Sequence, residues 1–192
     1  IYDDNAYFAH FARWSRADTK TFCDITPAYS ALNQDGFDYM KRFIASQHVA
    51  LKIFFVMRDP VDRLWSHMRY RDKGDDGSGL FKSWSKWIED PEFMAWANYK
   101  HTVEVLEGMF PAEDLLFLFY EDLFNEASLK TLCAFAGADH RPPQSEKAVN
   151  ETFLKLDLPG PVRDQLQARL RPQYEFCHQR FGDRVPASWL NP

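Results

Sequence analysis

The residues best suited to chemistry are an arginine and a serine, Arg58 and Ser66, which flank the stretch DPVDRLW. A guanidinium is a forked donor for phosphate or carboxylate oxygens, and the serine would add a hydroxyl. Asp59 and Pro60 are typical of a helix start, where free N–H groups and the helix dipole also attract anions. The pattern therefore indicates an anion site. The alternative is a plain pairing of Arg58 with Asp59 or Asp62 across the turn.

A strand is expected immediately before this turn. Residues 51–57, LKIFFVM, are apolar at six of seven positions and rich in β-branched and aromatic types. Such a run predicts a strand that is buried on both faces and central in a parallel sheet. A helix from Asp59 to about Arg71 would follow it. The turn then lies at the carboxyl edge of the sheet, where open α/β sheets bind their ligands.

The rest of the chain alternates between strand-like and helix-like patterns, which predicts an α/β fold with a central parallel sheet. The length of 192 residues fits a single domain. We expect further strands at 21–25 and 115–120, and helices at 5–14, 37–46, 80–88, 91–110, 125–136 and 161–181, the last interrupted at Pro172.

Three motifs together resemble those of sulfotransferases that use 3′-phosphoadenylyl sulfate (PAPS). The stretch 58–66, RDPVDRLWS, is similar to the signature with which that family binds the 3′-phosphate of the nucleotide. Residues 26–29, TPAY, resemble the TP-x-Y segment of the carbohydrate (heparan-type) and related bacterial branches. Residues 119–123, FYEDL, resemble the end of a family strand. The three motifs occur in the family's order.

This resemblance implies a three-layer α/β/α architecture, the P-loop-NTPase-like sulfotransferase fold. It also implies that Arg58 and Ser66 hold the 3′-phosphate and that Thr26 and Tyr29 lie on the acceptor side. The implied reaction moves a sulfuryl group from PAPS to a hydroxyl, or an amine, of a carbohydrate or other small acceptor, and it needs no metal.

Further site residues follow from the same resemblance. A late loop of the family closes over the 3′-phosphate, and Lys147, with Asn150 behind it, is the candidate here. The family's Lys-containing phosphosulfate loop has no counterpart in residues 1–192. We therefore expect the single domain 1–192 to lack its N-terminal strand and that loop, with the catalytic Lys and base upstream of Ile1. Within the chain, Asp24 is the candidate base, since it precedes Thr26 at the end of a predicted strand.

Structural roles are predicted for four neighbours of these residues. Arg63 could face the ligand or Asp59, and we favour an ion pair with Asp59. Glu121, after its strand, should cap or brace a neighbouring helix. His67 and Tyr99 are expected in or behind the core.

Composition bears on the kinds of partner and the cellular location that the chain can have. A net charge of −5 gives no general basic surface for nucleic acid, and three scattered cysteines form no disulfide framework or metal-ligand spacing. No apolar run has the length of a membrane span. These features favour a bacterial-like cytoplasmic enzyme, with the Golgi lumen as the alternative. Two other functions stay open, a P-loop-type nucleotide or small-molecule kinase and a non-catalytic sulfotransferase-like domain that binds a nucleotide or a partner.

Overall fold

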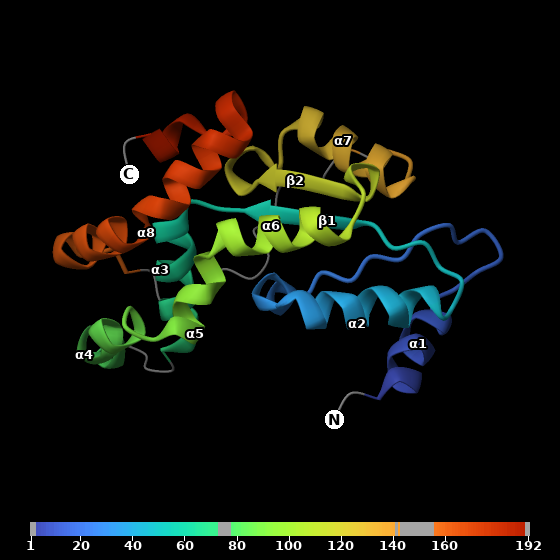
Figure 1. The fold of residues 1–192 in the computed structure, drawn as a ribbon, viewed down its shortest axis with the longest axis horizontal. Coiled ribbons are helices and arrows are strands. Elements are labelled where there is room, and N and C mark those ends of the chain that lie inside the picture. Colours follow the sequence, from blue (N-terminus) through green and yellow to red (C-terminus); the bar gives the residue numbers. More distant parts are fainter. Residues whose placement is uncertain (1–2, 73–77, 141, 143–155, 191–192) are drawn as a thin grey trace.

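Two parallel strands, β1 (Ile53–Met57) and β2 (Leu115–Phe119), lie at the centre of the fold (Figure 1). They pair from Ile53 opposite Leu115 to Met57 opposite Phe119, so both strands end at the same edge. The two apolar runs are therefore confirmed as neighbouring parallel strands. The computed structural model describes residues 3–72, 78–140, 142 and 156–190.

Helices make up most of the described residues. The α-helices are α1 (Asp4–Ala12), α2 (Gln34–Ala45), α3 (Pro60–Arg71), α4 (Ser78–Trp87), α5 (Pro91–Met94), α6 (Tyr99–Met109), α7 (Glu126–Ala136) and α8 (Gly160–Phe181). Short 3₁₀ turns are η1 (Pro27–Ala31), η2 (Ala95–Ala97), η3 (Ala112–Asp114), η4 (Tyr120–Asp122), η5 (Gly182–Arg184) and η6 (Ala187–Leu190).

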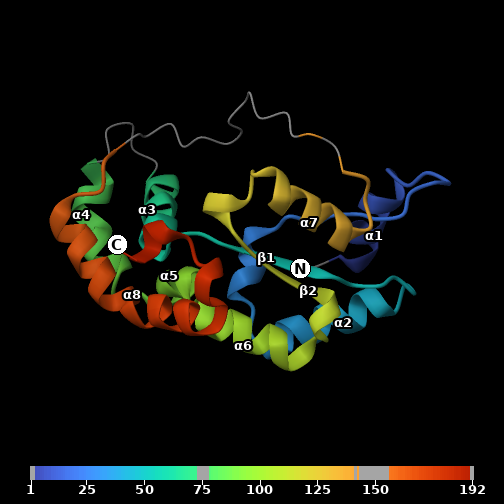
Figure 2. The ribbon, with the colours of Figure 1, turned by 90° about the horizontal axis from the view of Figure 1, so that it is seen from above.

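The sheet is covered by helices from both sides, since α6 and α7 lie on opposite sides of the two strands (Figure 2). On the α6 side, Ile53 and Leu115 pack against a cluster of Phe37, Leu106 and Phe110. The α/β class is therefore as predicted. The described residues contain two strands, so the wider sheet of a three-layer architecture stays a prediction.

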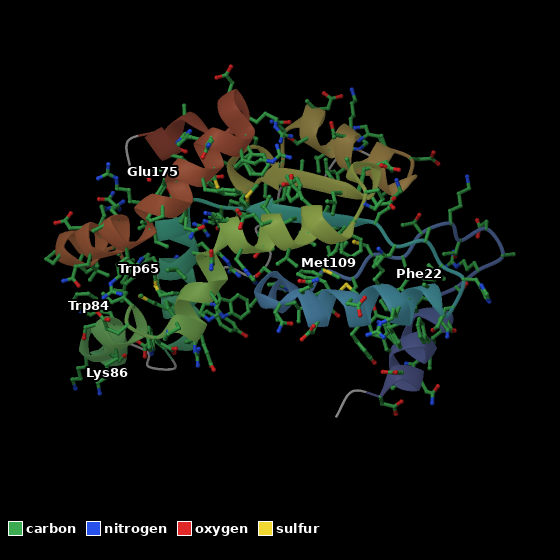
Figure 3. All side chains as sticks on the ribbon, in the orientation of Figure 1. Phe22, Trp65, Trp84, Lys86, Met109 and Glu175 are labelled. Carbon is green, nitrogen blue, oxygen red and sulfur yellow. The ribbon has the colours of Figure 1, made fainter. Side chains whose placement is uncertain are left out.

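The main core lies beyond the carboxyl edge of the sheet, between α3, α8 and the C-terminal turns. In α3 the apolar positions recur at helical spacing and face α8, which gives the helix one buried stripe. Trp65 is buried where α3 meets α8 (Figure 3). Trp189, near the C-terminal end of the described chain, is 1% exposed and belongs to the same core.

The prediction that the first strand is buried on both faces is wrong for most of β1. Met57 is fully buried, but residues 53–56 are half-buried. Within the described residues β1 has one neighbouring strand, β2, so part of its surface is left open. The continuous apolar run reflects burial at the carboxyl end, where Met57 enters the main core.

Residues 21–25 do not form the predicted strand. A strand needs a partner ladder for its N–H and C=O groups, and none of the described residues offers one to this segment. The segment runs instead past the end of α7, where the Thr21 hydroxyl donates to the carbonyl of Ala136 at 2.8 Å.

Two other predicted boundaries are wrong. The helix expected at 91–110 is broken at Asn98, whose backbone leaves the helical region and whose side chain accepts the N–H of His101 to start α6. The helix α8 runs without interruption through Pro172. Buried side chains on both sides of the proline, Leu166 and Tyr174 among them, hold α8 against the core, and this packing outweighs the cost of the proline.

Candidate functional site

Two side chains hold the turn between β1 and α3 by its backbone. The Tyr99 hydroxyl donates to the carbonyl of Arg58 at 2.7 Å and accepts from its N–H at 3.3 Å. Glu121 Oε1 accepts the N–H of Asp59 at 2.8 Å and the indole N–H of Trp189 at 3.0 Å. The predicted bracing role of Glu121 and the buried position of Tyr99 are both confirmed. Arg58 is therefore presented by a backbone that is fixed from two directions.

The backbone N–H groups of this turn are already used, which corrects the expectation that the helix start offers them to an anion. Asp59 caps α3, and its Oδ1 accepts the N–H groups of Val61 and Asp62, each at 3.0 Å. The N–H of Arg63 donates to the carbonyl of Asp59 at 2.8 Å, and Pro60 has no N–H. An anion at this edge must therefore be bound by side chains.

Arg58 is partly exposed and only loosely paired. Its Nη2 lies 3.8 Å from Oδ2 of Asp62, and its side chain is 31% exposed. The guanidinium also lies 5.1 Å from the centre of the Tyr120 ring. The pairing with Asp62 that the sequence offered as an alternative is thus present, but 3.8 Å exceeds hydrogen-bond length and exposed ion pairs of this kind are weak. Such a contact leaves the guanidinium able to bind another anion.

Ser66 lies on the same side of α3. It follows Asp62 by four residues, and residues at this spacing are neighbours on a helix surface. Ser66 is partly exposed, and its hydroxyl forms no hydrogen bond with the residues that the structure describes. Arg58 reaches toward Asp62 and Ser66 stands one turn further along, so the two predicted ligands of the 3′-phosphate share one face.

Arg63 does not form the ion pair with Asp59 that we predicted. Its guanidinium lies 5.2 Å from the centre of the Trp96 ring, and it makes no ion pair with any described residue. The carboxylate of Asp59 is occupied elsewhere, because the hydroxyl of Tyr174 donates to both of its oxygens at 2.9 and 3.0 Å. Cation–π stacking has replaced the expected salt bridge.

Burial controls the titration of groups beside the turn. Burial raises the pKa of Asp59, although the N–H of Asp62 and the hydroxyl of Tyr174 oppose the change. Burial, followed by the charges of Arg63 and Arg71, lowers the pKa of His67 to about 4. His67 packs against Trp96, with ring centres 4.6 Å apart, as expected for a residue behind the site. A neutral His67 adds no charge to the site near pH 7.

The predicted base Asp24 is surrounded by hydroxyl donors. Its Oδ2 accepts from Tyr29 at 2.8 Å and from Tyr7 at 3.1 Å, and its Oδ1 accepts from Thr26 at 2.7 Å. Thr26 and Tyr29, the two predicted acceptor-side residues, therefore converge on one carboxylate. This arrangement favours Asp24 as the anchor of the TPAY segment, since both of its oxygens already accept hydrogen bonds.

The turn η2 connects the TPAY segment to the region around the turn between β1 and α3. The turn η2 contacts both η1, which contains Tyr29, and α3. The hydroxyl of Thr102 in α6 fixes η1 by donating to the carbonyl of Ser30 at 2.7 Å. Trp96 of η2 stacks with Arg63, so the segment resembling the acceptor side lies across η2 from the predicted phosphate side.

Lys147 and Asn150 lie outside the described residues. The chain is next described at Leu156, whose carbonyl accepts the indole N–H of Trp65 at 3.1 Å. Trp65 is 4% exposed, so this contact with Leu156 lies at the edge of the core.

Reasoning from the sequence missed three residues of the site. Tyr174 donates to Asp59 from 115 positions away along the chain, and Trp189 donates to Glu121 from 68 positions away, so no local pattern links either pair. Tyr120 could have been expected near Arg58, because both residues directly follow parallel strands that end at one edge.

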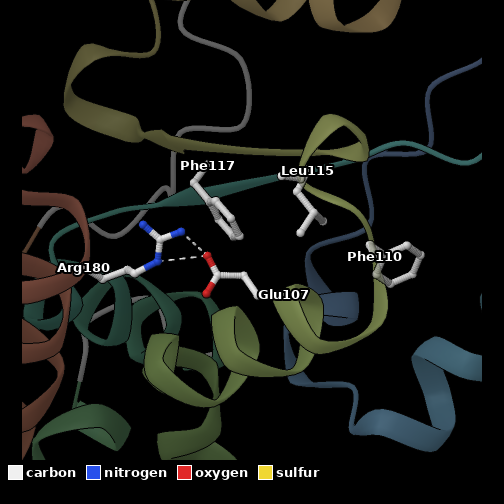
Figure 4. Close-up of a pocket in the computed structure, with 6 residues that line it drawn as sticks. Glu107, Phe110, Leu115, Phe117 and Arg180 are labelled. Atoms are coloured by element: carbon white, nitrogen blue, oxygen red, sulfur yellow. Dashed lines mark hydrogen bonds and ion pairs between the residues drawn. The ribbon is translucent and has the colours of Figure 1, made fainter.

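A cavity among the described residues lies away from the turn. Its volume is about 340 Å³, and it is lined by residues of α6, β2 and α8 near the amino end of the sheet (Figure 4). Glu107 and Arg180 pair across it, with Arg180 Nε 2.9 Å from Glu107 Oε1. The cavity contains no residue of the turn. Its lining residues are Glu107, Phe110, Ala112, Leu115, Phe117 and Arg180.

The described part of the chain lacks two kinds of feature. No cluster of three or more His, Cys, Asp or Glu side chains there could hold a metal ion. None of its helices combines the length and the apolar character that crossing a membrane requires.

Comparison with known protein families gives a match to a family model. The family model described as "Sulfotransferase domain" matches residues 40–156, which is more than half of the chain. The match includes both strands, all of α3 and the turn that carries Arg58. No curated protein matches the chain.

Proposed function

Because the chain belongs to the sulfotransferase domain family, we propose that it transfers a sulfuryl group from PAPS to a hydroxyl, or an amine, of a carbohydrate or other small acceptor. Membership of the family supports sulfuryl transfer in general. The donor, the acceptor class and the roles of individual residues are the proposed part.

One observation carries the proposal. Arg58 stands at the carboxyl end of β1 on a braced turn, with a loosely held guanidinium, and Ser66 follows on the same side of α3. A guanidinium and a hydroxyl so placed suit a phosphate monoester, because charge-assisted hydrogen bonds are the stronger kind. We assign the 3′-phosphate of the nucleotide to these two side chains. Lys147 and Asn150 are proposed to close over it.

The acceptor is assigned to the other side of η2. Thr26 and Tyr29, held by Asp24, form the wall on that side, and η1 contacts η2, whose Trp96 stacks with Arg63. Sulfuryl transfer needs an in-line geometry and cationic stabilisation of developing charge, as phosphoryl transfer does. We assign donor recognition to residues of this chain and assign no catalytic Lys or base within it.

The test is turnover of the full-length gene product with PAPS and a panel of carbohydrate and small hydroxyl acceptors. Chromatography of the nucleotide should show 3′-phosphoadenosine 5′-phosphate (PAP) forming only when an acceptor is present, at a rate unchanged by EDTA. Consumption of ATP that requires Mg²⁺ would instead establish the kinase alternative. Tight binding of PAP without turnover on any acceptor would establish the non-catalytic one.

A further inference from the structure

Arg63 is the second guanidinium at the start of α3, and the described residues give it no carboxylate partner. It is partly buried against Trp96. Burial lowers the pKa of Arg63, and the neighbouring positive charge of Arg58 lowers it further, although Tyr99 opposes the change. The two guanidinium groups are therefore close enough to repel each other.

The position of Arg63 on the helix places it beside Ser66. Three residues separate the two along α3, and residues at that spacing are neighbours on a helix surface. The nearest acidic side chains do not neutralise the pair. The carboxylate of Asp59 accepts hydrogen bonds from Tyr174 and from N–H groups of its own helix. The carboxylate of Asp62 is 3.8 Å from the guanidinium of Arg58, which is longer than a hydrogen bond.

We propose that Arg63 is a further ligand of the nucleotide's 3′-phosphate, acting beside Arg58 and Ser66. This inference rests on the proposed function. A phosphate monoester carries between one and a half and two negative charges at pH 7, roughly what two guanidinium groups balance. With the backbone N–H groups of the turn already used, side chains supply the donors for these charges.

Stacking on Trp96 explains why an arginine suits this position. The flat guanidinium can lie on an indole face and still point its N–H edge at a phosphate, whereas a lysine ammonium has no such plane. Trp96 is itself held by His67, whose ring centre is 4.6 Å away. The stack fixes the plane of Arg63 before the nucleotide binds.

Calorimetry with PAP and with AMP, which lacks the 3′-phosphate, tests the inference on Arg63→Gln. We expect PAP to bind about 10- to 100-fold more weakly than to the wild type, and AMP to change less than about threefold. Arg63→Lys should lose less PAP affinity than Arg63→Gln. The matched control is Arg71→Gln, which removes an exposed cation from the same helix and should leave both affinities within about twofold.

The outcomes separate this inference from the proposed function. If the wild type binds PAP and AMP equally, the proposed function and the inference both fail. If the wild type prefers PAP and Arg63→Gln keeps that preference in full, or loses PAP and AMP affinity equally, only the role of Arg63 is refuted.

A measurement on the wild type avoids any effect of the substitution on folding. Phenylglyoxal modifies accessible arginines, and peptide mass spectrometry reports the modified fraction of each one. PAP should protect Arg63, while AMP, at a concentration that gives the same saturation of the protein, protects it far less. Equal protection by the two nucleotides, or none by PAP, would overturn the assignment.

Discussion

Removing one oxygen atom from Tyr99 should loosen the turn that carries Arg58. The Tyr99 hydroxyl is the donor to the Arg58 carbonyl at 2.7 Å and the acceptor for its N–H at 3.3 Å. Burial raises the pKa of Tyr99 above its ordinary value, so the hydroxyl keeps its proton and can donate at every working pH. Tyr99→Phe keeps the ring in the core and deletes this link alone.

The expected cost in stability comes from the C=O and N–H groups of Arg58, which lose their hydrogen-bond partner. A buried donor or acceptor left without a partner costs about 1–3 kcal/mol, so the free energy of unfolding should fall by that amount. A domain of 150–250 residues loses about 2–4 °C of Tm per kcal/mol, so Tm should fall by about 2–12 °C. PAP affinity should also fall, because the backbone that positions Arg58 gains freedom.

Urea unfolding followed by circular dichroism measures the first effect, and calorimetry measures the second. The matched control is Tyr70→Phe, because Tyr70 is 77% exposed and its substitution should change stability by less than about 0.5 kcal/mol. If Tyr99→Phe is as stable as Tyr70→Phe and binds PAP as the wild type does, the bracing role of Tyr99 is refuted.

Three further predictions concern the surroundings of the turn. Glu121→Ala should lower the free energy of unfolding by about 1–3 kcal/mol in urea titrations, because two N–H groups lose their acceptor, whereas Asp122→Ala should change it by less than about 0.5 kcal/mol. Because the pKa of His67 falls to about 4 on folding, the unfolded chain binds its proton first, so stability should decrease as pH drops from about 6.5 to 4. His67→Gln should reduce this loss of unfolding free energy by about 1–2 kcal/mol, allowing for the partial exposure of His67. A variant with the same pH dependence of stability as the wild type would contradict this role of His67. Burial raises the pKa of Cys177 to about 12, so native protein should be alkylated by iodoacetamide at exposed Cys23 and not at Cys177, as peptide mass spectrometry can show.

The parts of the fold that could be predicted from the sequence depend on neighbouring residues. Asp59 and Pro60 fix the start of α3, and Gly137, with φ at 68°, ends α7, because each signal acts within one helical turn. The two apolar runs became parallel strands for a similar reason, since each is too short for a core helix and is bounded by polar residues.

The parts that were missed depend on distant contacts. Thr21–Ile25 has strand-like residues but no ladder partner among the described strands, and Pro172 is tolerated because tertiary packing holds α8 on both sides of it. The stacking of Arg63 on Trp96 joins residues 33 positions apart, and no sequence pattern distinguishes it from the ion pair that we expected.

The central claim is that Arg58 and Ser66 recognise a 3′-phosphate, and nucleotide discrimination tests it most directly. Calorimetry should show wild-type protein binding PAP at least about tenfold more tightly than AMP, with Arg58→Ala abolishing that preference and Ser66→Ala reducing it. Equal affinity of the wild type for the two nucleotides, or a full preference retained by Arg58→Ala, would contradict the assignment of this site.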